Sequence, residues 1–147
     1  MRQVLVKLLR RRHAISVENG MTHPGTPDLA CTLGWAELKA TEHWPVRPDT
    51  VVRMDHEFTP QQRIWHLRHR KAGGASLVII TVANDWLVFD GAVAAEHLEK
   101  VNQKRLRELA MFVCPRTPTT EEIERCFRLL PNLRTANDCA LPGDGAT

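Results

Sequence analysis

The sequence lacks several features that would assign it to a common class of protein. No apolar run in its 147 residues approaches the ~20 residues that a membrane-spanning helix needs. Its four cysteines lie far apart without a C-x-x-C pair, which leaves a zinc ribbon unsupported and favours reduced thiols. A G-x-x-x-x-G-K-[ST] phosphate loop and a G-x-S-x-G nucleophile elbow are also missing. We therefore expect no membrane partner, no nucleotide cofactor and no serine-hydrolase chemistry.

The amino-terminal residues have no long apolar stretch and no small-residue cleavage site, so the sequence predicts an intracellular, cytoplasmic protein without a signal peptide. Hydrophobic residues at 43% and charged residues at 25% are ordinary for a globular chain. We expect one domain over residues 1–130, with a core at 1–90 and a helical extension at 91–130. Residues 131–147 are rich in Pro, Gly, Asn and Asp and are typical of a flexible tail.

Acidic residues are scarce in two segments, although the net charge is only +3. Residues 1–24 contain five Lys or Arg and a single acid, Glu18, and residues 60–72 contain four Lys or Arg and no acid. The two segments could together form a cationic surface for a polyanion. The same charges equally fit the solvated faces of two amphipathic helices.

A hairpin in the first half of the chain is the main structural signal. Residues 28–33 and 35–40 have strand character and are joined by a tight turn at Gly34. The remaining periodicities and turn residues predict a helix over 2–12, a strand over 14–19, an irregular connection over 43–58, a helix over 60–72, strands over 75–82 and 86–89, and helices near 91–99 and 119–130. This order, α-β-β-β-α-β-β followed by carboxy-terminal helices, predicts an α/β fold with one central mixed sheet flanked by helices.

Asp28 and the Glu37-Leu38-Lys39 segment lie on the two strands of that hairpin. Side chains two residues apart on a strand share a face, so Glu37 and Lys39 point to the same side and Leu38 points into the core. If the strands pair, both carboxylates and the ammonium group converge at one end of the sheet.

Such a group suits phosphodiester chemistry. Asp28, Glu37 and the Leu38 carbonyl offer the hard oxygen ligands that Mg²⁺ or Mn²⁺ prefers, and such an ion polarises a phosphodiester and activates water. Lys39 can orient the water or stabilise charge on phosphorus. Taken separately, an E-x-K pair and a Pro-Asp turn are ordinary structural features. Their combination around one short hairpin favours a metal-dependent phosphodiesterase.

Several segments resemble a known family. The runs Glu18-Asn19, Pro24-Gly25-Thr26-Pro27-Asp28-Leu29 and Trp35-Ala36-Glu37-Leu38-Lys39 resemble the PD-(D/E)xK nuclease superfamily, whose domain is restriction-endonuclease-like. The runs Thr59-Pro60-Gln61-Gln62-Arg63-Ile64-Trp65-His66 and Ala72-Gly73-Gly74-Ala75 are similar to its VRR-NUC and phage Holliday-junction-resolvase-like branch. The resemblance covers roughly residues 1–90.

The resemblance implies a Mg²⁺- or Mn²⁺-dependent DNA endonuclease of the phage type, selective for branched DNA or Holliday junctions. It assigns catalysis to Asp28, Glu37 and Lys39 and places Gln62 close to the site. A phage-encoded protein would act in the bacterial host cell, and family resolvases are dimeric, which favours a homodimer. A restriction- or repair-type nuclease and an inactive nucleic-acid-binding module remain alternatives.

Two residues keep two interpretations each. Relatives carry an acid in the first helix where residues 2–12 have none, so Glu18 is either a further metal ligand or a charged strand end. Gln62 either serves the site or completes a capping box with Thr59, the cap of a helix that has Pro60 at its first position.

The basic segments are the expected DNA contacts. We expect backbone contacts from Arg10, Arg11, Arg12, Arg63, Arg70 and Lys71. His66 and His69 lie three residues apart without further zinc ligands at suitable spacing, so they are interpreted as part of a solvated helix face.

Overall fold

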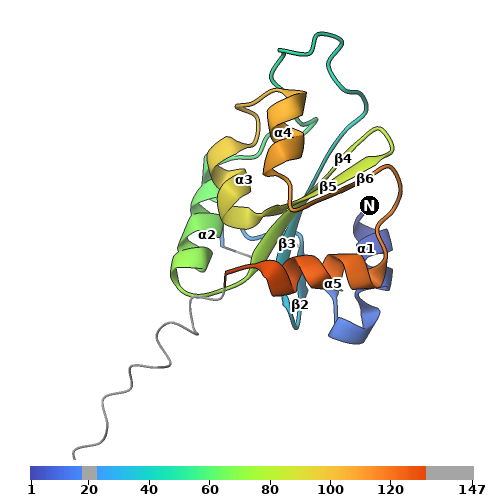
Figure 1. Ribbon diagram of the computed structural model, residues 1–147. Coiled ribbons are helices and arrows are strands. Elements are labelled where there is room, and N and C mark those ends of the chain that lie inside the picture. The colour runs from blue at the N-terminus through green and yellow to red at the C-terminus, as the bar shows by residue number, and fades with distance from the viewer. Residues whose placement is uncertain (18–22, 132–147) are drawn as a thin grey trace, which may run out of the picture.

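A computed structural model describes residues 1–17 and 23–131 of the chain (Figure 1). Its elements are α1 (Arg2–Leu8), the 3₁₀ helix η1 (Arg10–Arg12), β1 (Ile15–Ser16), β2 (Leu29–Cys31), β3 (Gly34–Thr41), α2 (Pro60–Lys71), β4 (Ser76–Val82), β5 (Asp85–Asp90), α3 (Gly91–His97), α4 (Gln103–Leu109), β6 (Phe112–Cys114) and α5 (Thr120–Leu129). Within the described ranges, no helix has the length and apolarity to cross a membrane.

The six strands form one mixed sheet in the order of the sequence, from β1 to β6. Neighbouring strands are antiparallel except β3 and β4, which run parallel and are linked through the 42–59 segment and α2. The expected hairpin is present, with Cys31 opposite Gly34 in the β2–β3 register. This topology confirms the α/β class and the central mixed sheet flanked by helices.

The sheet has an apolar core on each face, as alternation along β4 requires. Leu77 and Ile79 pack under α1 and α5, whereas Val78 and Ile80 pack under α3 and α4. Figure 1 shows α2, α3 and α4 on one side of the sheet and α1 and α5 on the other. The central strands are therefore covered on both sides.

Helix α2 begins where its sequence predicts. The Thr59 hydroxyl accepts a hydrogen bond from Gln62 N at 3.2 Å, and Gln62 Oε1 accepts one from Thr59 N at 2.9 Å. Pro60 occupies the first helical turn. The capping box is thus formed, and it fixes the orientation of Gln62 at the start of the helix.

Several expected elements differ in the structure. The helix expected over 2–12 is divided into α1 and η1, and the strand expected over 14–19 pairs only at Ile15–Ser16. Helix α4 and strand β6 were not anticipated, since β6 is three residues long and is defined by its pairing with β5. Glu18 and nearly all of the expected tail, 131–147, lie outside the described residues.

A buried carboxylate joins the two ends of the described chain. Glu124 on α5 has a side chain only 1% exposed and accepts hydrogen bonds from Arg11, Arg12 and Arg128 at 2.8 to 3.2 Å. These hydrogen bonds, first that from Arg11 and then that from Arg12, hold the pKa of Glu124 near 2, below its usual 4.5. Arg11 and Arg12 of η1 therefore bind α5 of the same chain.

We predict that Glu124→Gln lowers Tm at pH 7 by several degrees, because the glutamine leaves three guanidinium groups without their anion. A carboxyl whose pKa is depressed on folding stabilises the protein above its unfolded value of 4.5, and this contribution disappears as pH falls toward 2. The Tm difference between variant and wild type should therefore shrink over that interval. Thermal unfolding followed by circular dichroism measures it.

The matched control is Glu121→Gln on the same helix, whose side chain is 73% exposed and lies 3.6 Å from Arg11. We expect little change in Tm, because exposed ion pairs contribute weakly. An equal loss of Tm in both variants would show that the buried Glu124 contributes no more to stability than the exposed Glu121.

Candidate active site

The predicted acidic residues meet in an open pocket of about 350 Å³. Its lining comes from the start of α1, the residue before β2, the middle of β3, the connection after β3 and the first turn of α2. Its lining residues are Met1, Arg2, Asp28, Glu37, Leu38, Lys39, His56 and Gln62. The structure thus brings together all four residues to which the sequence assigned catalysis.

Asp28 precedes β2 and reaches across to the neighbouring strand. Its Oδ2 accepts a hydrogen bond from Leu38 N at 3.0 Å, and its Oδ1 accepts one from Arg2 at 2.7 Å. The Leu38 N–H therefore faces the pocket instead of a partner strand. The N–H and C=O of one extended residue share an edge, so the Leu38 carbonyl faces the pocket as well.

Glu37 is the most deeply buried acid of the pocket, with 2% of its surface exposed. Its Oε1 accepts a hydrogen bond from Gln62 Nε2 at 2.9 Å and lies 3.5 Å from Lys39 Nζ. Its Oε2 is buried without any hydrogen-bond partner among the described residues. Burial, and secondly the charge of Asp28, raise the pKa of Glu37 from 4.5 to about 8.

Gln62 fulfils both of the roles that its sequence context allowed. Its carbonyl oxygen closes the capping box with Thr59, and its amide nitrogen donates to Glu37. The two ends of one amide act at once, so the helix cap also determines the position of Glu37. Lys39 is held in a similar way, because Nζ donates to Glu57 O at 3.1 Å.

The donor set fits a hard divalent cation. Asp28, Glu37 and the Leu38 carbonyl present oxygen atoms to one pocket, and the unpartnered Oε2 of Glu37 is a buried acceptor for which the described protein supplies no donor. Within the described ranges, no cluster of three or more His, Cys, Asp or Glu side chains is arranged for a metal. The Leu38 carbonyl is the third oxygen that the described residues offer beside the two carboxylates.

The loop before Asp28 packs directly on α2. Gly25 has φ of +83°, and a Cβ there would collide with the backbone of Gln61. A side chain at this position would be strained in conformation and would push the loop away from the helix. Glycine thus lets the Pro24–Asp28 segment lie against the first turn of α2.

Besides Met1, two pocket residues were not anticipated from the sequence. Arg2 binds Asp28, and exposed His56 comes from the irregular connection between β3 and α2. No local pattern marks either residue, because each reaches the pocket through the packing of a distant segment. Arg2 adds a guanidinium group beside Asp28, and His56 adds an imidazole to the pocket.

The structure gives other roles to several expected DNA contacts. Arg63 donates to the carbonyls of Phe58, Ala95 and Leu98 at 2.7 to 3.1 Å. Arg70 forms a two-fold ion pair with Asp90 at 2.9 and 3.2 Å. Their guanidinium groups hold α2 against α3, so both residues belong to the scaffold.

The three expected DNA contacts on η1 also differ in role, since Arg11 and Arg12 bind Glu124. Arg10 and Lys71 are exposed. The interpretation of His66 as solvated is wrong: it is fully buried, with Nδ1 2.7 Å from Ser76 Oγ, and burial lowers its pKa to about 3. The inward face of α2 therefore carries a neutral histidine.

Comparison with known proteins identifies the fold. The chain is similar in structure to Hjc, a Holliday junction resolvase from the archaeal hyperthermophile Archaeoglobus fulgidus, with a TM-score of 0.52 and 16% sequence identity. The match covers 86% of this chain and 95% of the resolvase. No family model and no curated protein matches the sequence. The likeness confirms the expected α/β fold, which this chain shares with the resolvase.

We predict that Glu37→Gln stabilises the metal-free protein and that the gain grows with pH. Below pH 4.5 the carboxyl is protonated in both the folded and the unfolded chain. Between 4.5 and about 8 the unfolded chain ionises while the folded chain retains its proton, so the wild type loses stability that the glutamine retains. Tm measured in EDTA from pH 4.5 to 8.5 should diverge by a few degrees or more, since ~1 kcal/mol shifts Tm by roughly 2–4 °C.

Glu42→Gln is the matched control, because Glu42 directly follows β3 and its side chain is 84% exposed. We expect its Tm to follow that of the wild type at every pH. A Glu37→Gln protein that is less stable than the wild type throughout would contradict the buried-repulsion account.

Proposed function

We propose that this protein is a Mg²⁺- or Mn²⁺-dependent DNA endonuclease of the PD-(D/E)xK type, from the VRR-NUC and phage-resolvase-like branch. We propose further that it selects its substrate by DNA structure, in the manner of a Holliday junction resolvase. The observation that carries the proposal is the convergence of Asp28, Glu37, Lys39 and Gln62 in one open pocket.

Each residue has a distinct task in this proposal. Asp28, Glu37 and the Leu38 carbonyl would hold the ion, which supplies Lewis acidity toward the phosphodiester when bound. Lys39 lies 3.5 Å from the Glu37 carboxylate and would orient the attacking water or stabilise charge on phosphorus. Gln62 keeps Glu37 in place through its 2.9 Å hydrogen bond.

The free energy lost by burying Glu37 beside Asp28 favours a catalytic role over DNA binding alone. Two acids in a pocket repel each other and repel phosphate, and burial already keeps Glu37 from ionising at its usual pH. A module that only binds DNA would gain nothing from this arrangement. A divalent ion would remove the repulsion, satisfy Oε2 of Glu37 and attract phosphate.

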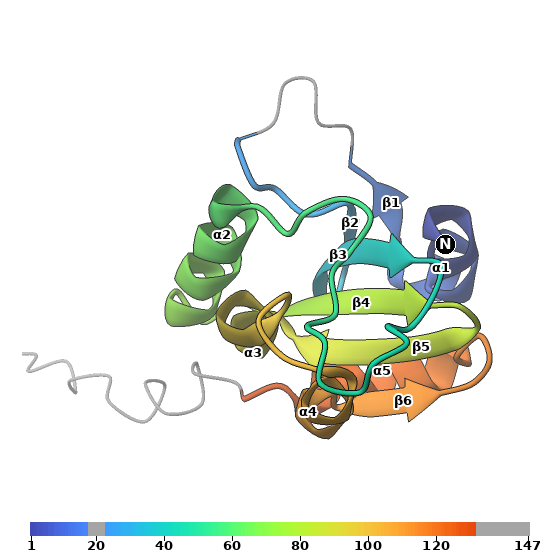
Figure 2. The same ribbon diagram turned by 90° about the horizontal axis from the view of Figure 1, so that it is seen from above.

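Selection by DNA structure is supported by the fold and by the arrangement of helices. The fold is similar to that of Hjc, which is a Holliday junction resolvase. Helices α1 and α2 flank the β2–β3 hairpin from opposite sides (Figure 2), so a backbone passing over the pocket would meet both. Backbone contacts carry little sequence information, which leaves shape as the basis of selection.

We also propose a homodimer. Resolution of a junction requires a cut in each of two strands, and the described residues form one such carboxylate pocket per chain. Two copies would present two sites to one branched substrate.

We predict metal-dependent cleavage of branched DNA that Asp28→Asn reduces by at least about 100-fold. Loss of a metal ligand removes several kcal/mol of transition-state stabilisation, and about 1.4 kcal/mol corresponds to tenfold in rate. Asparagine retains an oxygen that can accept from Leu38 N, so the loop should keep its position. The measurement compares four-way junctions, flaps, nicked duplex and linear duplex with Mg²⁺, Mn²⁺ or EDTA.

Glu42→Gln again provides the control and should cleave like the wild type. Addition of Mg²⁺ should also raise the Tm of the wild type and of Glu42→Gln, but not that of Asp28→Asn, because only an intact site gains binding energy. DNA binding without product in any metal would contradict the enzyme and support the inactive module. Cleavage confined to one linear sequence would support a restriction-type enzyme.

We predict that raising salt from low to physiological concentration weakens DNA binding several-fold through counterion release. Substitution of exposed Arg10 or Lys71 by alanine should reduce the slope of log K against log salt by about 0.9 for each phosphate contact removed. Lys104→Ala on α4 serves as the control. Helix α4 leads into β6, which forms the edge of the sheet opposite to β1. Fluorescence anisotropy gives the slopes, and slopes unchanged in both test variants would remove these residues from the interface.

A further inference from the structure

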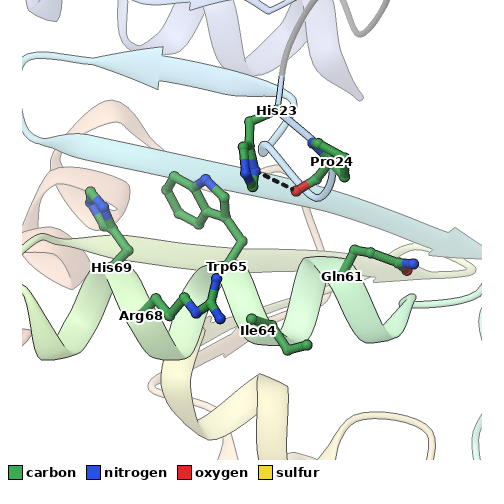
Figure 3. A pocket seen from close by; sticks show the side chains of 7 residues that line it. All are labelled: His23, Pro24, Gln61, Ile64, Trp65, Arg68 and His69. Atoms are coloured by element: carbon green, nitrogen blue, oxygen red, sulfur yellow. Dashed lines mark hydrogen bonds between the residues drawn. The ribbon is translucent and has the colours of Figure 1, made fainter.

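A second pocket lies beside the candidate active site (Figure 3). It has a volume of about 440 Å³ and is bounded by the loop before Asp28 and by the face of α2 that carries Trp65. Its lining residues are His23, Pro24, Gln61, Ile64, Trp65, Arg68 and His69. Nothing in the proposed hydrolytic chemistry uses these residues.

One side of this pocket is an aromatic surface that is already ordered. The Trp65 ring stacks on His69, with centroids 4.5 Å apart and planes inclined by 20°. Trp35, on β3, packs against the same indole in an edge-to-face arrangement, with ring centroids 5.5 Å apart. Burial lowers the pKa of His69, so its ring stays neutral at pH 7. Trp65 is therefore held in place by its neighbours before any ligand arrives.

The pocket continues directly from the active site. The loop contributes Pro24 to this pocket and Asp28 to the other, and the first turn of α2 contributes Gln61 here and Gln62 there. Gly25 packs against the backbone of Gln61, which fixes loop and helix relative to each other. A strand whose phosphate lay over Asp28 could therefore continue along the loop and α2 toward Trp65.

The charge around the aromatic surface suits a nucleotide. None of the described lining residues is acidic, and Arg68 is exposed without an ion-pair partner among the described residues. Ile64, which is 47% exposed, adds apolar area to the lining. An aromatic plane, an apolar side chain and a guanidinium group match the base, the sugar and the phosphate of a single nucleotide.

We propose that this pocket binds an unstacked nucleobase of the DNA substrate next to the scissile phosphate, with Trp65 as stacking surface and Arg68 as phosphate contact. The inference rests on the proposed function and adds the feature by which a branch is distinguished from a regular duplex. A base in a continuous duplex is already stacked, whereas a base at a branch point costs less to turn outward. The pocket would therefore favour branched or frayed DNA.

The proposal is tested by measuring the binding of protein variants to DNA forks from which single bases have been removed. The probe is a fluorescein-labelled fork whose unpaired thymidine arms carry an abasic site at each of the first three unpaired positions in turn. Affinities are measured in EDTA, so that metal-dependent cleavage does not interfere. On the fork with all bases, Trp65→Ala should bind about 5- to 100-fold more weakly, the range that one base–aromatic stack contributes.

The decisive comparison is between wild type and Trp65→Ala on the abasic forks. On one of these forks the two proteins should bind with equal affinity, because the base that stacks on Trp65 is missing. Trp65→Phe should restore most of the affinity on the complete fork, because it retains an aromatic face. Arg68→Ala should lower the salt slope by about 0.7, the value for one contact to a single strand. Leu67→Ala, 40% exposed on the same helix but outside the pocket, should behave like the wild type.

Other outcomes would overturn the inference. An equal loss in Trp65→Ala on complete and on every abasic fork would show that no base enters the pocket. A change from dimer to monomer in Trp65→Ala, measured by sedimentation, would show that a second copy covers this face. The nuclease proposal is judged separately: base-dependent binding without cleavage would contradict that proposal alone, and cleavage without base dependence would contradict this inference alone.

Discussion

The burial of Glu37 beside Asp28 is the constraint around which the candidate site is built. The protein supplies two groups to one oxygen of Glu37, the Gln62 amide and the Lys39 ammonium, and none of the described residues supplies a donor to the other. A fold selected for stability alone would not keep such a pair, because a buried acid without full compensation opposes folding. A divalent ion would supply the positive charge that the two carboxylates lack. A local loss of folding stability of this kind is typical of functional sites.

Helix α2 connects that constraint to the remainder of the molecule. Its first turn orients Gln62, its inward face buries His66 against Ser76, and its basic side chains Arg63 and Arg70 fasten it to α3. Another face carries Trp65, which contacts Trp35 on β3, and lines the second pocket. A helical period of 3.6 residues lets one short segment present these different groups to different neighbours. The capping box therefore determines more than where the helix begins, because it also sets the position of every side chain on it.

Local features of the fold and the site were predictable, whereas long-range partners were not. The hairpin, the capping box and the shared face of Glu37 and Lys39 follow from turn residues and from periods of two and 3.6 residues. The basic side chains of 60–72 were interpreted as one surface, but Arg63 donates to three backbone carbonyls and Arg70 pairs with Asp90 at the end of β5. Charge counting cannot separate an arginine in a scaffold from an arginine on a surface, since the difference depends on which segments fold against it.

The sequence by itself determined the α/β class and the β2–β3 hairpin, because these depend on residues close together in the chain, and its resemblance to a known family named Asp28, Glu37, Lys39 and Gln62 as candidate site residues. Only the tertiary structure decided that Arg2 reaches Asp28, that Arg11 and Arg12 bind Glu124 more than 110 residues away, and that β6 completes the sheet. These contacts join segments that no periodicity relates. Their partners are selected by the packing of layers around the two cores, where a charge is stable only if a particular distant group meets it.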